Sequence, residues 1–575
     1  MGLHRLQISL ITLALAISVS VFAKNSPKKY ELYKPGEVLV KLSDSAPRDW
    51  GLKVSQKLEA LKIKDLGAIS LVFSNWRKLS FPVDSDMNSV IKFVSKVDNV
   101  VHVEPHFLYH LLGYVPQEAS FKNQWALFNS GQSVYGTSGT MGADINMLRT
   151  WNISPGVRFA AKNVVVAVID TGIAFAHPDL NENIWTNSKE IPADGVDNDQ
   201  NGYIDDEHGW DWSELGDIHQ PGYKNGDNNP EDDVFHGTHV SGIIGASHNS
   251  KGVAGINAAV QLMPLRFISR TNGSVEGAVK AIEYAVQMGA DVINASWGGS
   301  GNSLLISEAI GYAKDHGLLF IAAAGNDGMD NDSLPSFPSN DSNALSVAAT
   351  DNNDRLTLFS NFGRNKVHIG APGYYIESTM PPVWYAKNNV AMMSGTSMAA
   401  PQVTGVAAML IGLFPDKYKG KPEALRKRLL ESSDTQMNLI SRVSSGGRLN
   451  AYNAIMGVTT PGHYDSEEIT WTKKVDRIIE SRHPYENNTL KEWTIKHPGA
   501  QWIRLKLGRY ALESINDGVE LYDTQGQIVD IISGFGMDTP SKPIKGDEVK
   551  IVFRSGKMVT GWGFEILGYE VSEER

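Results

Sequence analysis

Between Gln117 and Ile455, short unbroken apolar runs alternate with stretches that have the apolar period of a helix. Residues 164–169 and 290–294 are rich in valine and isoleucine, and residues 274–288 repeat their apolar positions every three to four residues. A strand that is apolar on both sides is buried on both faces, and the intervening helices supply the cover. The pattern predicts an α/β domain built on a mostly parallel sheet, with functional side chains at the carboxyl ends of its strands.

The 575-residue chain is long enough for several domains, and the patterns change on either side of this region. The segment before it shows strands and helices in the order βαββαβ, which is typical of a small α+β unit. The segment after it alternates apolar and polar residues between turn-forming pairs, which favours a β-sandwich or jelly roll. We therefore expect an N-terminal segment at 1–23, an α+β domain at 24–116, an α/β domain at 117–456, a linker at 457–468 and a β-sandwich domain at 469–575.

Residues 1–23 have the features of a secretory signal peptide. Arg5 precedes an apolar run that ends at Ala23, a small residue of the kind that signal peptidase requires. An uncleaved membrane anchor is the alternative. No later stretch approaches the roughly 18 to 20 apolar residues of a spanning helix, so we expect no membrane span in the mature form. The predicted location is outside the cytoplasm, either extracellular or periplasmic.

Charge and cysteine content exclude several classes of function. The chain has 64 acidic and 53 basic residues, a net charge of −11, which argues against a nucleic-acid partner. It has no cysteine, which excludes disulfides, thiolate metal sites and cysteine nucleophiles. Residues 182–235 hold 15 acidic residues and two lysines. An exported chain without disulfides needs another source of stability, and a metal bound by these acids is the candidate.

Three motifs supply a carboxylate, an imidazole and a hydroxyl. Asp170 ends the apolar run at 164–169, His236 begins His-Gly-Thr-His, and Ser397 lies within Ser-Gly-Thr-Ser-Met-Ala-Ala-Pro. Taken singly, the aspartate could cap a turn, the serine could start a helix, and His236 with His239 could be half of a zinc site. Taken together, in the order Asp, His, Ser, they are the groups that activate a serine nucleophile.

These motifs resemble those of the subtilisin-like serine protease (subtilase) family over residues 117–455. The resemblance implies the three-layer subtilase fold, with Asp170 as the orienting carboxylate, His236 as general base and acid, and Ser397 as nucleophile. It also implies that Asn326, which follows another apolar run, donates its amide to the oxyanion. A zinc site would need a third ligand nearby and would leave the serine motif unexplained.

The same resemblance predicts where a peptide substrate lies. Gly273-Ser274 and Ser296-Trp297-Gly298 match the two segments between which the family binds an extended peptide as an added strand. Trp297 stands where the family often has a smaller aliphatic residue. We therefore expect an altered specificity pocket.

The acidic region also contains a loop with the pattern of a calcium site. Asp197, Asp199 and Asn201 alternate, and a glycine and Asp205 follow. This spacing resembles the Asp-x-Asp-x-Asn-Gly loops that point oxygen ligands at a hard cation. A solvated acidic loop without metal is the alternative.

A second calcium site is implied by the family resemblance alone. Asp179 and Asn249 match ligands that subtilases place beside the helix of the catalytic histidine. Lys251 departs from the apolar residue that is usual in this segment.

The flanking segments resemble other parts of subtilase precursors. Residues 24–116 resemble the inhibitory propeptide, which assists folding, occupies the active site and is removed autocatalytically. Residues 469–575 resemble a CUB-like β domain. We expect an exported, calcium-dependent serine endopeptidase that cuts proteins or peptides through an acyl-enzyme, with its own propeptide as intramolecular inhibitor. The alternative is a non-catalytic binding or adhesive protein that retains the protease fold.

Overall fold

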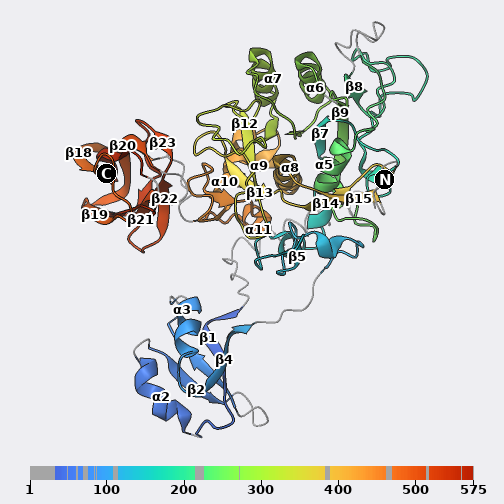
Figure 1. The fold of residues 1–575 in the computed structure, drawn as a ribbon. Helices are drawn as coiled ribbons and strands as arrows, with labels where there is room; N and C mark the ends of the chain where they lie inside the picture. The colour runs from blue at the N-terminus through green and yellow to red at the C-terminus, as the bar shows by residue number, and fades with distance from the viewer. Residues whose placement is uncertain are drawn as a thin grey trace. The chain divides into compact units, whose positions relative to one another are not determined.

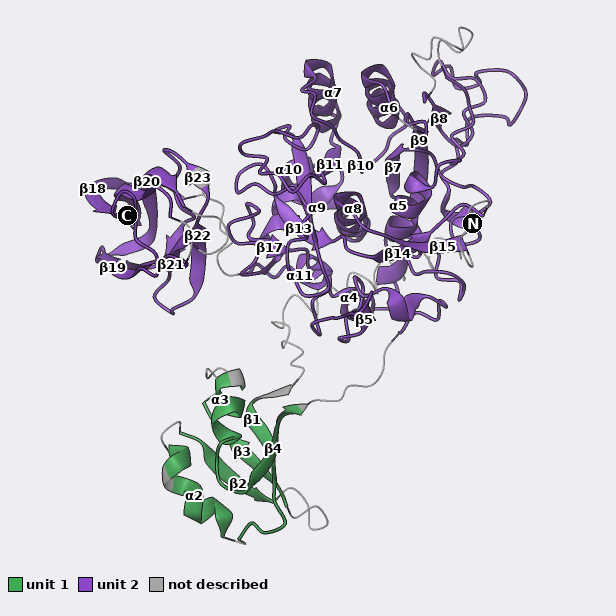
Figure 2. Ribbon diagram, viewed as in Figure 1, with its two compact units in different colours: residues 1–113 green, residues 114–575 purple. Residues whose placement is uncertain are grey.

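The computed structural model divides into two compact units, residues 1–113 and 114–575 (Figure 2). The predicted signal peptide and most of the predicted linker lie outside the described residues. The structure describes residues 33–47, 49–59, 62–68, 75–82, 85, 87–107, 114–213, 226–270, 272–382, 389–460, 469–512, 517–557 and 560–573.

The first unit is an antiparallel sheet with two helices, and its element order is the predicted βαββαβ. The strands are arranged β2-β3-β1-β4. Val38 and Val40 alternate along one strand with partly exposed neighbours and pack with Trp50 and Val94 from the helices. One face of the sheet therefore holds the core of this unit. Its elements are β1 (Tyr33–Leu42), α2 (Trp50–Glu59), β2 (Lys64–Ala68), β3 (Trp76–Ser80), α3 (Met87–Val94) and β4 (Val100–Phe107).

A nine-stranded sheet forms the centre of the second unit, in the order β16-β17-β13-β12-β11-β10-β7-β9-β8. Every neighbouring pair is parallel except β16 with β17, which confirms the predicted mostly parallel sheet. The strands are β7 (Val165–Asp170), β8 (Trp210–Asp211), β9 (Gln261–Arg266), β10 (Val292–Ala295), β11 (Leu319–Ala323), β12 (Ala344–Thr350), β13 (Ile369–Pro372), β16 (Asp434–Thr435) and β17 (Gly447–Arg448).

Helices cover both faces of this sheet, giving three layers (Figure 1). Along β7, Val166 and Val168 pack on one side with α5 (His236–Gly245) and α8 (Thr396–Leu413). The alternate residues of the strand, such as Ile169, pack on the other side with α6 (Val275–Gln287) and α7 (Leu304–Asp315). Burial on both faces is why these strands are apolar throughout.

Within the described residues, α8 is the one helix with the length and apolar composition of a membrane span. Of its apolar window, 89% is buried inside the protein, where it packs against α5 and five strands of the sheet. Its composition is therefore explained by its place in the core.

Smaller elements complete the α/β domain. A hairpin of β14 (Ile376–Thr379) and β15 (Val390–Met393) packs against α5. The others are β5 (Ser133–Val134), β6 (Thr137–Ser138), α4 (Met147–Trp151), α9 (Pro415–Tyr418), α10 (Pro422–Glu431), α11 (Ala451–Met456) and the 3₁₀ turns Phe121–Asn123, Val157–Phe159 and Asn181–Asn183.

The C-terminal region is a β-sandwich, as predicted. One sheet has the order β18-β26-β20-β23 with β24 beside β20, and the other has the order β19-β25-β21-β22. Alternate apolar residues of both sheets, such as Leu505 and Ile551, share one core. The strands are β18 (Lys473–Glu480), β19 (Leu490–Lys496), β20 (Ala500–Ala511), β21 (Gly518–Tyr522), β22 (Ile528–Ile532), β23 (Phe535–Gly536), β24 (Ile544–Lys545), β25 (Glu548–Arg554) and β26 (Gly563–Glu573).

Candidate active site

The end of β7 and the beginning of α5 bring Asp170 and His236 together. Asp170 is the last residue of its strand and 0% exposed, and His236 is the first residue of its helix. His236 Nδ1 and Asp170 Oδ1 are 2.7 Å apart. A carboxylate only accepts hydrogen bonds, so Nδ1 donates and Nε2 of the neutral ring is left to accept a proton.

The surroundings of His236 favour its charged form. Burial lowers the pKa of the imidazole, but the charge and hydrogen bond of Asp170 and the charge of Asp232 raise it by more, so the net direction is upward from 6.5. The His236 side chain is still 23% exposed, so a substrate can reach the ring. An imidazolium that forms during proton transfer is therefore stabilised where it forms.

His239, one turn further along α5, lies in a different environment. It is fully buried, and its Nε2 lies 3.1 Å from the carbonyl oxygens of Ile376 and Ala391 in the β14–β15 hairpin. Burial lowers its pKa to about 3. A neutral imidazole that links a helix to a hairpin in this way has a structural role.

Ser397 lies in the first turn of α8, beside the end of β10. Its hydroxyl donates to the Ser296 carbonyl at 2.9 Å, and the Ser296 hydroxyl donates to the Ser397 carbonyl at 3.0 Å. Among the described residues, the Ser296 carbonyl is the one hydrogen-bond partner of the Ser397 Oγ. Asn294 in turn donates its amide to the Ser296 hydroxyl at 3.0 Å. The backbone around the serine is thus fixed, while its hydroxyl can rotate to a new acceptor.

Asn326 follows β11 and has its amide oriented by the start of α8. Its Oδ1 accepts from both the backbone N–H and the hydroxyl of Thr396, each at 2.9 Å. With the oxygen held in this way, the two amide hydrogens on Nδ2 remain for another acceptor. Because β11, β10 and β7 are neighbours in the sheet, Asn326, Ser296 and Asp170 follow adjacent strand ends.

The residue before Asn326 has to be glycine. Gly325 has a φ of +109°, and a Cβ there would lie 2.4 Å from the Asn361 amide nitrogen. Asn361 Oδ1 also accepts from the backbone of Asp327 and Met329, which shapes the turn beyond Asn326. A larger residue at 325 would displace this turn.

Phe267 contacts both predicted substrate segments. Its ring centroid is 4.8 Å from that of Trp297, and a Cβ on Gly273 would meet the Phe267 ring at 2.6 Å. Ser274 caps α6, because its hydroxyl accepts from the Gly277 N–H at 3.0 Å. Sequence reasoning did not single out Phe267, which has no signal beyond being apolar after β9.

The second segment is held against the loop that follows Asn326. Gly299 exchanges two backbone hydrogen bonds with Phe337, at 2.8 and 2.9 Å. A Cβ on Gly298 would lie 3.1 Å from the Phe337 carbonyl oxygen, so this approach is close. Trp297 packs inward on Phe267 and Phe320, in the helix layer opposite α8.

Three carboxylates, two buried and one half-buried, gather in the acidic region. Ligand oxygens of Glu190, Asp199 and Asp206 all lie within 4.8 Å of one another. Burial raises the pKa of Asp206, and hydrogen bonds from Tyr284 and other neighbours offset only part of that shift. Glu190 uses Oε1 for two backbone N–H groups, while its buried Oε2 has no hydrogen-bond partner in the described part of the chain. Such a donor set fits a hard divalent cation.

The other predicted loop ligands make different contacts. Asp197 accepts from the backbone N–H groups of Asn201 and Gly202, at 3.0 and 2.9 Å. Asp205 accepts from two backbone N–H groups of the same loop, and the Asn201 amide donates to Asp206 at 2.8 Å. The loop pattern therefore predicted Asp199, but not Glu190 or Asp206, as a member of this cluster. Asp206 directly follows Asp205 in the sequence, and this neighbouring acid was a signal that could have identified it.

The second predicted calcium pair is in contact. The Asn249 amide donates to the Pro178 carbonyl at 2.9 Å and lies 3.4 Å from Asp179 Oδ1. Glu118 joins them: its Oε1 accepts from Ser250 N–H at 3.1 Å, and its buried Oε2 has no partner within the described ranges. The sequence patterns did not single out Glu118, which lies 61 residues before Asp179 in a segment without a clear pattern.

Comparisons with known proteins agree with this site. A model of the subtilase family matches residues 161–454. The chain is 29% identical over 471 residues to the thermophilic serine proteinase of Bacillus sp. (strain AK1), covering 78% of this chain and 98% of that protein. It is 30% identical over 309 residues to thermitase of Thermoactinomyces vulgaris, covering 53% of this chain and 92% of thermitase.

A solved structure described as proteases from Pseudoalteromonas arctica PAMC 21717 is 25% identical, with a TM-score of 0.47, and the match covers 60% of this chain and 99% of that one. The family model spans about half of the 575 residues and includes all four residues of the Asp170, His236, Asn326 and Ser397 constellation. The chain therefore belongs to the subtilase family of serine proteases.

Proposed function

We propose that the chain is an endopeptidase in which Ser397 is the nucleophile, His236 the general base and acid, and Asp170 the carboxylate that orients the imidazole. The observation that carries this proposal is the 2.7 Å contact between His236 Nδ1 and Asp170 Oδ1. It leaves Nε2 as the proton acceptor. Ser397 stands in the first turn of α8.

Acylation starts when the Ser397 hydroxyl rotates from the Ser296 carbonyl toward His236. The hydroxyl proton passes to Nε2 while Oγ attacks the carbonyl carbon of the scissile peptide bond. Negative charge develops on the carbonyl oxygen, where the Asn326 amide and the Ser397 backbone N–H donate hydrogen bonds. The tetrahedral intermediate collapses when His236 gives its proton to the leaving amine, which leaves an ester on Ser397.

Deacylation repeats these steps with water in place of the serine. His236 takes a proton from water, the hydroxide oxygen attacks the ester carbon, and the charge returns to the oxygen held by Asn326. Collapse then transfers the proton from His236 to the Ser397 oxygen. The carboxylic acid product leaves, and the enzyme is restored.

Casein hydrolysis by the purified protein tests these roles. Wild type should cleave casein, whereas Ser397→Ala and His236→Ala should show no hydrolysis above background, because each removes a group that the proton transfer requires. Circular dichroism should show that both variants are folded. Activity that survives in Ser397→Ala would contradict the assignment of the nucleophile.

Calcium is the cation that we propose for the cluster of Glu190, Asp199 and Asp206, and for the second pair, Asp179 with Asn249. The close approach of three carboxylates, two of them buried, and the unpartnered Glu190 oxygen support it, since Ca²⁺ takes oxygen ligands and neutralises their repulsion. When bound, calcium would hold the acidic region in place and take no part in the peptide chemistry.

Titration calorimetry with calcium tests this assignment. Wild type should bind calcium, and Glu190→Gln should lose one binding event. The matched control is Glu182→Gln, which removes the same charge from an exposed position in the same region. Equal binding by both variants would contradict the site.

We also propose that the chain is exported and processed from a precursor. Residues 1–23 have the sequence of a signal peptide, and residues 33–107 contain a folded α+β unit in the position of a propeptide. Sequencing the N-terminus of secreted protein tests both steps. Ser397→Ala should retain residues from Lys24 onward, whereas wild type should begin between His110 and Ser120. Wild-type material that keeps residues 24–107 would contradict autoprocessing.

A further inference from the structure

Asp232 lies in the loop four residues before His236 and is almost completely enclosed, with 3% of its surface exposed. Its Oδ1 accepts from the Thr171 hydroxyl at 3.0 Å and from the backbone N–H groups of Val234 and Phe235, at 2.9 and 2.8 Å. Its Oδ2 accepts from the backbone and the hydroxyl of Thr238, at 2.9 and 2.6 Å. Five donors and no acceptor face this carboxylate, which is the complement of its ionised form.

These bonds join the two segments that carry Asp170 and His236. Thr171 directly follows Asp170, and its hydroxyl donates to Asp232 while it accepts from the Gly237 N–H at 2.8 Å. Thr238 lies in the first turn of α5. Asp232 therefore ties the residue after Asp170 to the residues after His236.

The backbone around Asp232 is packed against the same segment. The Ile173 N–H donates to the Pro230 carbonyl at 3.1 Å, and the Asp232 N–H donates to the Ile173 carbonyl at 3.3 Å. Gly172, between these contacts, has a φ of +100°, and a Cβ there would lie 2.4 Å from the Pro230 oxygen. The loop before His236 thus lies directly on the loop after Asp170.

Phe235, immediately before His236, has a φ of +123°, a backbone conformation that residues with a side chain rarely adopt. Such a conformation persists only where the surroundings hold it in place. The Phe235 N–H donates to Asp232, and its carbonyl accepts from the His239 N–H at 3.0 Å. Asp232 thereby helps to hold the unfavourable residue that sets the direction in which His236 leaves the loop.

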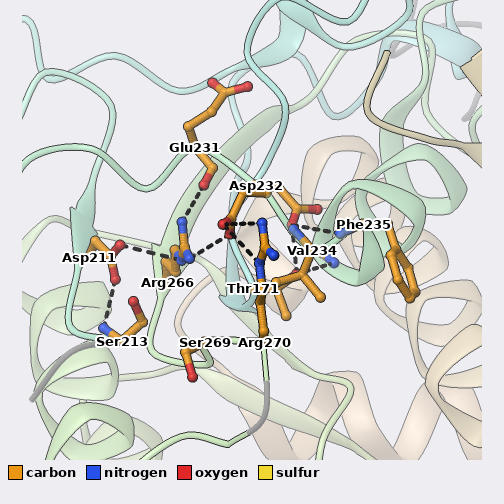
Figure 3. A network of polar contacts seen from close by, with 12 residues as sticks. Thr171, Asp211, Ser213, Glu231, Asp232, Val234, Phe235, Arg266, Ser269 and Arg270 are labelled. Carbon is orange, nitrogen blue, oxygen red and sulfur yellow. Dashed lines mark hydrogen bonds and ion pairs between the residues drawn. The ribbon is translucent and has the colours of Figure 1, made fainter. Parts of the chain in front are cut away.

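Arg266, at the end of β9, holds the other side of this loop (Figure 3). It donates to the Glu231 carbonyl and to the Asp233 carboxylate, both at 2.7 Å, and pairs with Asp211 at 3.3 Å. The Asp233 side chain is 49% exposed, and among the described residues it pairs with Arg266 and Arg270 rather than with α5. Adjacent aspartates therefore have different partners, which makes Asp233 a matched control for Asp232.

We propose that Asp232 is a positioning residue for the His236–Asp170 pair, fixing the first turn of α5 against the loop after β7 and placing a buried negative charge beside the imidazole. This inference rests on the proposed roles of His236 and Asp170. It assigns Asp232 no contact with the substrate.

The charge of Asp232 gives the inference a second consequence. The groups that influence the charge on His236 are Asp170 at the end of β7, Asp232 in the preceding loop and His239 on α5. Asp170 and Asp232 both raise the pKa of His236. Loss of the Asp232 charge should therefore lower that pKa, whereas a general loss of stability would leave it unchanged.

Steady-state kinetics of Asp232→Asn on a chromogenic peptide test the positioning role. Asparagine has one accepting oxygen and an NH₂ group that would face donors, so α5 loses part of its attachment. We expect kcat to fall by about 10- to 100-fold, because small misplacements of catalytic groups have effects of this size, with KM changed by less than about threefold. The acid limb of kcat/KM should move to lower pH by about half a unit or more. Asp233→Asn should stay within about twofold of wild type in kcat, with the acid limb unmoved.

If Asp232→Asn is not processed to the mature enzyme, an NMR titration tests the same inference. In the full-length Ser397→Ala protein, the downfield NMR signal of the His236 Nδ1 proton reports its bond to Asp170 and its titration. Addition of Asp232→Asn should lower the pH at which this signal titrates, and addition of Asp233→Asn should not. An unchanged titration, or a kcat and acid limb equal to those of wild type, would overturn the inference. Failure of the proposed function is distinguishable, since it would appear as wild-type activity in His236→Ala.

Discussion

Two buried acidic sites in this protein, separated by a few dozen residues of sequence, satisfy their carboxylates in opposite ways. Asp232 is a single carboxylate that accepts from five donors. Glu190, Asp199 and Asp206 are three carboxylates whose oxygens lie within 4.8 Å of one another, and one buried oxygen of Glu190 has no partner among the described residues. The first site is complete as the chain folds it, whereas the second keeps a buried oxygen that a bound cation would satisfy.

Asp170 lies between these two extremes. It accepts from the Thr171 N–H at 2.8 Å and from His236 at 2.7 Å, so one of its partners can change charge. The number of donors and whether they titrate therefore distinguish Asp232, the proposed metal ligands and the proposed catalytic carboxylate Asp170 within one domain.

The largest expected effect follows from removing the charge at Asp170. Asp170→Asn should lower kcat by about 10⁴-fold, because an amide can hold the imidazole in the wrong tautomer and leaves the imidazolium without its counter-charge. Active-site kinetics on a peptide substrate would measure it. A loss of less than about tenfold would mean that Asp170 acts as a structural carboxylate, as Asp232 does.

Calcium removal should give the next largest effect. A bound ion that saturates its site adds about 3 kcal/mol to the free energy of unfolding at 100 times its Kd. For a domain of this size, a chelator should lower the melting temperature by about 4 °C. Asp199→Asn should already melt at the lower temperature and respond less to chelator. A melting temperature that is indifferent to chelator in wild type would mean that the cluster is satisfied without metal.

A decrease in pH should change the thermal stability in opposite directions with and without calcium. Burial raises the folded-state pKa of Asp206 above the ordinary 3.8, so the folded metal-free protein binds more protons than the unfolded chain. Its stability therefore falls as pH rises through this window, and mild acid should raise the melting temperature in chelator. When calcium is present, protons compete with the ion for the carboxylate, so the same decrease in pH should lower the melting temperature.

Asp144 and Asp211, whose pKa values burial raises to about 6, titrate in the same window. The readout is therefore the difference between wild type and Asp206→Asn in thermal melts at pH 5 and 7. If the two proteins respond equally in chelator, Asp206 does not carry the effect.

The smallest effect should come from Glu182, an exposed carboxylate of the same acidic region. Glu182→Gln should change the free energy of unfolding by no more than about 0.5 kcal/mol, because water already solvates this charge. Thermal melts beside Glu190→Gln would show whether burial, rather than net charge, decides the outcome. Equal shifts in the two variants would point to overall charge instead.

Sequence patterns predicted the fold and the candidate reacting groups because both are visible in short stretches of sequence. Buried parallel strands have to be apolar on both faces, so β7, β10 and β11 were visible, and their carboxyl ends located Asp170, Ser296 and Asn326. The contact between Asp170 and His236 follows from this topology.

What the sequence did not reveal depends on packing between distant segments. Glu190 reaches Asp199 because the 187–190 turn folds beneath the acidic loop, and no spacing rule encodes that approach. Phe267 and Asp232 are ordinary residues in loops, and only their neighbours in space give them a role. The metal and substrate assignments for individual residues stay predictions.

The burial of α8 determines where substitutions can change the substrate preference of this protein without abolishing its activity. Ser397 stands in the first turn of a helix that is enclosed by the core for most of its length. The loops at 267–270 and 298–301 follow β9 and β10 and lie outside that helix. Changes in those loops should alter which peptide is cut, whereas a larger side chain at Ala407, fully buried within α8, should abolish cutting of every peptide.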